Sequence, residues 1–254
     1  MAKRAIAIAS HPDDIEFMMA GTLLRLKELG YEIHYMTIAD GALGGNMLCH
    51  SELAARRRSE AKAAAEMAGA VYHEAITHDL EVFYNTEQLT KVVRVVREVD
   101  PEIVLTHGPF DYMEDHINAG RLAVSAAFCR GMGNFRGVED LPPVSTDVAV
   151  YHSLPLSLRD QLNRPVIPDV FVDVTSTIPM KRRMLNCHQT QKQWLDESQG
   201  MDAYLEDMVS RARAMGELCG FCEYAEGWVH HNPNGFCPDD FDPLAVIARP
   251  AVKK

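Results

Sequence analysis

Residues 5–14 read AIAIASHPDD, an apolar run that stops at a histidine, a proline and two aspartates. The five leading apolar residues predict a short strand buried on both faces. The run follows Lys3 and Arg4, as in a secretory signal, but it is too short for the apolar core of one. We therefore expect a first strand in a protein whose default location is cytoplasmic.

Short apolar runs and longer helical patterns alternate through the first half of the chain. This β–α–β order predicts an α/β fold with a Rossmann-like, mostly parallel sheet and helices on both faces. Ser51 and Gly69 are predicted to begin and end one helix, and Gly30 is predicted to end another. Strands are expected at residues 5–9, 33–38, 71–76 and 103–106, and helices at 17–29, 51–68, 87–99 and 115–129.

The pattern changes after residue 131, where prolines and polar residues interrupt it. We expect a smaller α+β portion there and an irregular tail from residue 232. The whole chain, residues 1–254, is interpreted as one domain with a core over about 1–130 and a C-terminal portion over about 131–254. Its expected strands cover residues 148–152 and 170–174, and its expected helices cover 179–189 and 202–218.

The composition narrows the choice of partners. The chain has a net charge of −11, and its one dense basic run, residues 56–58, lies in a helical pattern. Nucleic acids and anionic membranes attract clustered Lys and Arg, so neither is an expected partner. No apolar stretch approaches the length of about 18 residues needed to cross a membrane.

Six cysteines are scattered along the chain, which argues against a disulfide framework. The pair Cys219 and Cys222 has a spacing found in zinc knuckles, and Cys237 follows. A second, structural metal site is one interpretation of this cluster. The alternative, which we favour, is that Cys219 and Cys222 are small buried residues at the end of a helix.

His11, Asp13 and Asp14 follow the first predicted strand directly. An imidazole and a carboxylate three residues apart can turn toward one zinc ion. The neighbouring carboxylate is then free to act as a general base on water that the metal activates. In the alternative interpretation, the two aspartates only cap the helix that follows.

A second polar segment, HGPFDYMEDH at residues 107–116, also follows a predicted strand. Since strand ends of a parallel sheet meet at one edge, both segments are expected to lie together. His116 is a candidate third ligand, and Asp111 or Asp115 is a candidate to orient an imidazole. The alternative is a helix start whose acidic residues interact with the helix dipole.

These motifs together resemble the PIG-L/LmbE-like zinc deacetylases, which remove acetyl groups from N-acetylglucosaminyl compounds. The resemblance rests on ASHPDD at residues 9–14, a Gly-rich loop over residues 40–46, Arg57 with Glu60, and Asp115-His116; it is weaker in the second half, around residues 188–191. It implies a Zn²⁺ cofactor (another divalent metal is an alternative), a small amino-sugar substrate and a homo-oligomer. It also implies that His11, Asp14 and His116 are the ligands, Asp13 is the base, and Arg57 and Asn46 bind substrate.

The chain departs from the family at Met113, where members usually carry a histidine that stabilises the oxyanion. Methionine has no proton to donate. We consider His107, His152, His188, His230 and His231 as substitutes, and Met113 itself as part of a less polar substrate pocket. Three functions remain open: an N-deacetylase of amino sugars, an amidase or esterase for larger acyl groups, and a metal- or carbohydrate-binding protein without catalysis.

Overall fold

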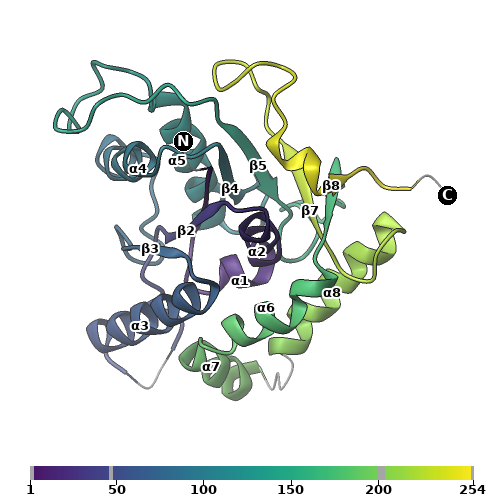
Figure 1. Cartoon of the computed structure of the whole chain (residues 1–254). Helices are drawn as coiled ribbons and strands as arrows, with labels where there is room; N and C mark the ends of the chain where they lie inside the picture. Colours follow the sequence, from purple (N-terminus) through teal and green to yellow (C-terminus); the bar gives the residue numbers. More distant parts are fainter. Residues whose placement is uncertain (1–2, 46–47, 200–203, 253–254) are drawn as a thin grey trace.

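The computed structural model describes residues 3–45, 48–199 and 204–252. One mixed sheet runs through the molecule in the order β3-β2-β1-β4-β5-β7-β6-β8 (Figure 1). Strands β3, β2, β1, β4 and β5 are parallel neighbours, whereas β7 is antiparallel to both β5 and β6. The strands are β1 (Arg4–Ala9), β2 (Glu32–Thr37), β3 (Val71–His73), β4 (Ile103–His107), β5 (Ala149–Ser153), β6 (Val170–Asp173), β7 (Ala225–His230) and β8 (Ala248–Arg249).

Helices cover both faces of the sheet, as the alternating sequence predicts (Figure 1). One face carries α4 and α5, and the opposite face carries α1, α2, α3, α6 and α8. None of the helices in the described part of the chain is both long and apolar enough to cross a membrane. The helices are α1 (Asp14–Met18), α2 (Ala20–Glu28), α3 (His50–Ala68), α4 (Thr86–Val99), α5 (Glu114–Cys129), α6 (Ile178–Leu185), α7 (Gln189–Gln199) and α8 (Tyr204–Cys219).

The apolar run of β1 supplies both halves of the core. Its alanines at positions 5, 7 and 9 face the layer that contains α2, and Ile6 and Ile8 face the layer that contains α4 and α5. All five side chains have no solvent exposure. This two-sided burial explains why the run is continuously apolar rather than alternating.

Three local predictions are wrong in detail. The predicted helix over residues 17–29 is broken at Met19, whose φ of −133° separates α1 from α2. Helix α3 has Cys49 rather than Ser51 at its N-cap, and the carboxylate of Glu52 accepts the N–H of Cys49 at 3.3 Å. Strand β3 ends at His73 instead of residue 76.

The second half of the chain joins the same sheet instead of building a separate one. Strand β7 was not predicted, and the predicted helix over residues 179–189 ends at Leu185 before α7 begins. A buried carboxylate links the halves, because Glu226 of β7 accepts the N–H groups of Gly21 and Thr22 at 2.9 and 2.7 Å. The break between α1 and α2 leaves these groups free, and Lys181 of α6 neutralises Glu226 at 2.6 Å.

Candidate metal centre and active site

The turn that follows β1 presents two adjacent carboxylates. Asp13 has a φ of 100°, in the left-handed region that Asp tolerates better than most residues. Asp14 begins α1, and its carboxylate accepts the backbone N–H of His11 at 2.7 Å. The short motif therefore folds back on itself and directs Asp13 and Asp14 to different neighbours.

Asp14 lies between two histidines from different parts of the chain. Its Oδ2 is 3.5 Å from Nδ1 of His11, and its Oδ1 is 3.5 Å from Nε2 of His116, which is in the first turn of α5. Ligand atoms of these three residues all lie within 4.8 Å of one another. The parallel pairing of β1 with β4 brings the two segments to one edge of the sheet, as predicted.

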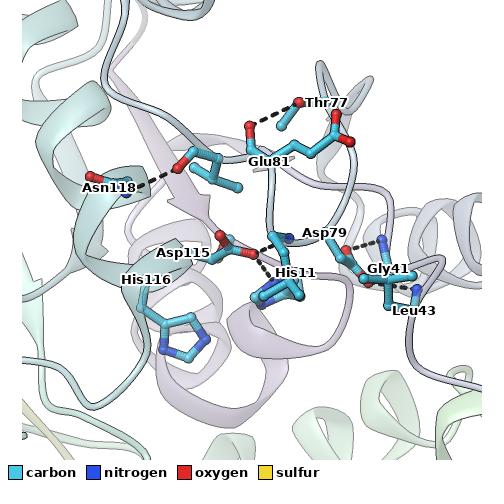
Figure 2. Close-up of polar contacts among 12 residues, drawn as sticks. His11, Gly41, Leu43, Thr77, Asp79, Glu81, Asp115, His116 and Asn118 are labelled. Carbon is cyan, nitrogen blue, oxygen red and sulfur yellow. Dashed lines mark hydrogen bonds and ion pairs between the residues drawn. The ribbon is translucent and has the colours of Figure 1, made fainter.

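The outer nitrogen of each of these histidines faces another carboxylate. Nε2 of His11 is 3.0 Å from Asp115, as Figure 2 shows, and Nδ1 of His116 is 3.1 Å from Asp111. Each imidazole therefore has one nitrogen held from outside and the other directed at Asp14. This is the arrangement in which carboxylates fix metal-binding histidines.

The residues present fit a divalent cation. Two neutral imidazoles and one carboxylate form a donor set that zinc accepts, with a position left for water or substrate. The cluster has excess negative charge: although burial alone lowers the pKa of His11, hydrogen bonds to Asp115 and Asp14 raise it to about 10. A metal cation at the centre would neutralise the negative charge of the carboxylates in place of a proton on the imidazole.

His107 stacks on His116, with ring centroids 4.1 Å apart. Its Nε2 accepts the N–H of Ser10 at 2.9 Å and lies 3.2 Å from Oδ2 of Asp14. Burial and the neighbouring His116 lower the pKa of His107. His107, Asp111 and His116 form a second possible metal group, but His107 and Asp111 do not line the large cavity described below.

Asp13 stands apart from the possible ligands. The hydroxyl of Tyr204 donates to its Oδ2 at 2.6 Å, and Arg57 lies 3.7 Å from the same oxygen. Burial raises the pKa of Asp13, against the lowering effect of Arg57. Tyr204 was not predicted as a site residue, because it lies in α8, 191 residues after Asp13 in the sequence.

Arg57 connects the two loops beside the site. Its guanidinium donates to the carbonyl of Pro12 at 2.6 Å and to that of Gly41 at 3.0 Å. The side chain is buried, and Glu60 instead accepts the N–H and hydroxyl of Thr190. From its place in a charged helical pattern, Arg57 could also have been a surface charge paired with Glu60 or Glu52, and its burial rules this out.

A segment between β3 and α4 supports the same loops, and the sequence did not reveal it. Asp79 accepts the N–H groups of Gly41 and Leu43 at 2.7 and 2.9 Å, and the N–H of Leu80 donates to Asp115 at 2.7 Å (Figure 2). A Cβ on Gly41 would lie 2.6 Å from the Arg57 side chain, and its φ is +77°. Glycine is therefore required where the loop meets Arg57.

A cavity of about 580 Å³ opens above the cluster. Its volume is in the range of small-molecule sites. Its floor includes His11, Asp13, Asp14 and His116, together with Arg57. Its walls include Phe17, Leu43, Leu80, Tyr112, Met113, Leu156, Gln191, Leu195 and Arg211.

Met113 lines this cavity, as predicted, and its backbone N–H donates to Asp111 at 3.1 Å. Asn46 lies outside the described residues. None of the five histidines considered as substitutes lines the cavity. His107, His152 and His231 line a smaller one of about 240 Å³, His188 contacts Glu16 at 3.2 Å, and His230 stacks on Tyr151.

The cysteines do not form a metal site. Sγ of Cys219 is 3.4 Å from Sγ of Cys222, but no group of three possible ligands among the described residues includes a cysteine. Cys219 is fully buried at the end of α8, and Cys237 packs in a different part of the core. The structural-metal interpretation is wrong, and the packing interpretation holds.

A family model described as PIG-L: GlcNAc-PI de-N-acetylase matches residues 6–127. The diacetylchitobiose deacetylase of Thermococcus kodakarensis is 30% identical over 200 residues, covering 74% of this chain and 70% of that protein. The chain belongs to the PIG-L family. The 4-oxalmesaconate hydratase of Pseudomonas putida is 27% identical over 198 residues, which cover 73% of this chain and 72% of that protein. As a PIG-L relative of deacetylases and hydratases, the chain is an enzyme.

Solved structures of this family share the fold. The N,N'-diacetylchitobiose deacetylase from Pyrococcus horikoshii superposes with a TM-score of 0.76 at 23% identity, covering 94% of this chain and 88% of that one. The hydratase GalB of Pseudomonas putida superposes with a TM-score of 0.74 at 24% identity, and the match covers 91% of this chain and 97% of that one. Proteins that share this fold therefore include both a deacetylase and a hydratase.

Arg57→Ala should lower the free energy of unfolding by about 2–4 kcal/mol, because it leaves the carbonyls of Pro12 and Gly41 without their charged donor. Arg56→Ala is the matched control. Arg56 is the exposed neighbour of Arg57, and its loss should change stability by less than about 0.5 kcal/mol. Denaturant unfolding measures both, and equal effects of the two substitutions would contradict the role of Arg57.

Proposed function

We propose that the chain is a zinc-dependent N-deacetylase of N-acetylated amino sugars. One observation carries the proposal: the carboxyl of Asp13 lines the same cavity as the cluster of His11, Asp14 and His116 but is not a member of that cluster. A metal-binding site alone has no need of this extra carboxylate. The deacetylase relative in Thermococcus kodakarensis supports an N-acetylglucosamine-type substrate.

The proposed chemistry assigns a proton path to Asp13. When bound, zinc lowers the pKa of water and polarises a carbonyl group. Asp13 takes the proton from the attacking water and returns it to the nitrogen of the leaving amine. Tyr204, which donates to Oδ2 of Asp13, holds the carboxyl in place and leaves Oδ1 for this exchange.

Tyr112 is proposed as the donor that replaces the family histidine at Met113. It lines the cavity, and its ring lies 5.8 Å from that of His116 in an edge-on arrangement. Burial and the nearby Asp14 raise the pKa of Tyr112, so its hydroxyl keeps the proton that an oxyanion requires. Methionine at the next position cannot supply one.

A second candidate is hydration of a carbon–carbon double bond in an unsaturated acid. The hydratase relative motivates it, and two guanidinium groups, those of Arg57 and Arg211, line the cavity and suit a carboxylate. A third, cleavage of larger acyl groups, is motivated by the apolar walls. Acetate release from N-acetylated sugars, compared with turnover of butyryl analogues and of unsaturated diacids, separates the three.

Asp13→Asn should reduce the rate of acetate release from diacetylchitobiose by about 10²–10⁴-fold, because the amide cannot accept the proton of water. Bound zinc, measured by atomic spectroscopy, should remain at the wild-type level, since Asp13 is not a proposed ligand. Asp240→Asn, at an exposed position, is the control and should leave the rate unchanged. If the zinc-loaded Asp13→Asn variant turned over at the wild-type rate, Asp13 would not be the general base. If the wild-type protein kept its full rate after complete removal of metal by a chelator, the reaction would not depend on zinc.

Tyr112→Phe should lower kcat by about a hundredfold with little change in KM, because the hydroxyl acts on the oxyanion and not on the bound substrate. Tyr84→Phe, which removes a hydroxyl beside the smaller cavity, is the matched control. Met113→His in the Tyr112→Phe background should restore part of the rate. An unchanged kcat in Tyr112→Phe would show that this phenol is not the donor.

A further inference from the structure

Two histidines and an aspartate form a second cluster outside the catalytic cavity. Asp40 follows β2, His50 is the first residue of α3, and His78 lies between β3 and α4. Ligand atoms of the three residues all lie within 4.8 Å of one another. Nδ1 of His78 contacts Oδ2 of Asp40, and the rings of His50 and His78 meet edge-on at 4.8 Å.

The cluster has the chemistry of a divalent-metal site. Two imidazoles and a carboxylate suit zinc and its neighbours in the first transition row. Tetrahedral zinc with bonds of about 2.1 Å holds its ligand atoms about 3.4 Å apart, so a small rotation of these side chains closes the set. His50 and His78 are exposed, so that rotation meets little resistance from packing.

The local charge also favours a cation. The carboxylates of Asp40, Asp79 and Glu81 all interact electrostatically with His78, so the surroundings of the cluster are negatively charged. The same field attracts a metal ion, which competes with the proton on the imidazole. No lysine or arginine forms a recorded ion pair with Asp40 in the described part of the chain.

This cluster is separate from the catalytic one but connected to its supports. It shares no residue with His11, Asp14 and His116, and none of its members lines the large cavity. His78 precedes Asp79 and Leu80, whose contacts hold the Gly41–Leu43 loop and Asp115. Asp40 is the residue before that loop.

We propose that Asp40, His50 and His78 form a second divalent-metal site, weaker than the catalytic one, on the rim of the substrate cavity. The ion joins the end of β2, the start of α3 and the segment after β3. Water occupies its remaining position, because both histidines face solvent. Since exposed ligands are less preorganised, its affinity is lower than that of the buried cluster.

Zinc titration of the metal-free full chain near neutral pH tests this proposal, with bound zinc per chain measured by atomic spectroscopy. The wild type should bind two zinc ions in two steps. His78→Ala and His50→Ala should each weaken the second step by about tenfold or more, leaving one tight ion. His230→Ala, a histidine in no possible metal group, is the control and should still bind two.

His11→Ala provides the reciprocal measurement, because it should remove the tight step and keep the weak one. This variant also separates the second site from the proposed catalytic function, which depends on the tight ion alone. If His78→Ala does not fold, His50→Ala decides the matter. The proposal would be overturned if the wild type bound only one zinc ion per chain. It would also be overturned if the His50→Ala and His78→Ala variants both still bound two zinc ions per chain.

Discussion

The carboxylate of Asp14 contacts three histidines from two segments of the chain. It accepts the N–H of His11 at 2.7 Å and faces His107 and His116 at 3.2 and 3.5 Å. These segments meet because β1 and β4 are parallel neighbours whose ends lie at one edge. Replacing Asp14 would remove the carboxylate that these three imidazoles share, so the site and the local fold both depend on it.

The rest of the site is arranged around that centre by backbone contacts. Arg57 fixes the turn at Pro12 against the loop at Gly41, and Asp79 fixes the same loop from the other side. The left-handed conformation of Asp13 directs its carboxyl to Tyr204 rather than to the histidines. Two adjacent aspartates thereby acquire different surroundings, which is what a separate ligand and base require.

Much of this arrangement follows from the sequence, because local signals carry it. The continuous apolar run of β1 and the meeting of parallel strand ends at one edge suffice to predict that the segments containing His11, Asp14 and His116 lie together. Contacts between distant segments were not predictable. Tyr204 and Asp79 lie in ordinary stretches, and only the folded chain places them beside Asp13 and Gly41.

We propose that one metal ion lies between His11, Asp14 and His116 and that Asp13 is not coordinated. Anomalous diffraction from zinc-loaded crystals, recorded on both sides of the zinc absorption edge, would locate the ion. The expected peak lies about 2.0–2.2 Å from a ligand atom of each of the three residues. A peak coordinated by Asp13, or one held by His107 and Asp111 instead of His11 and Asp14, would contradict it.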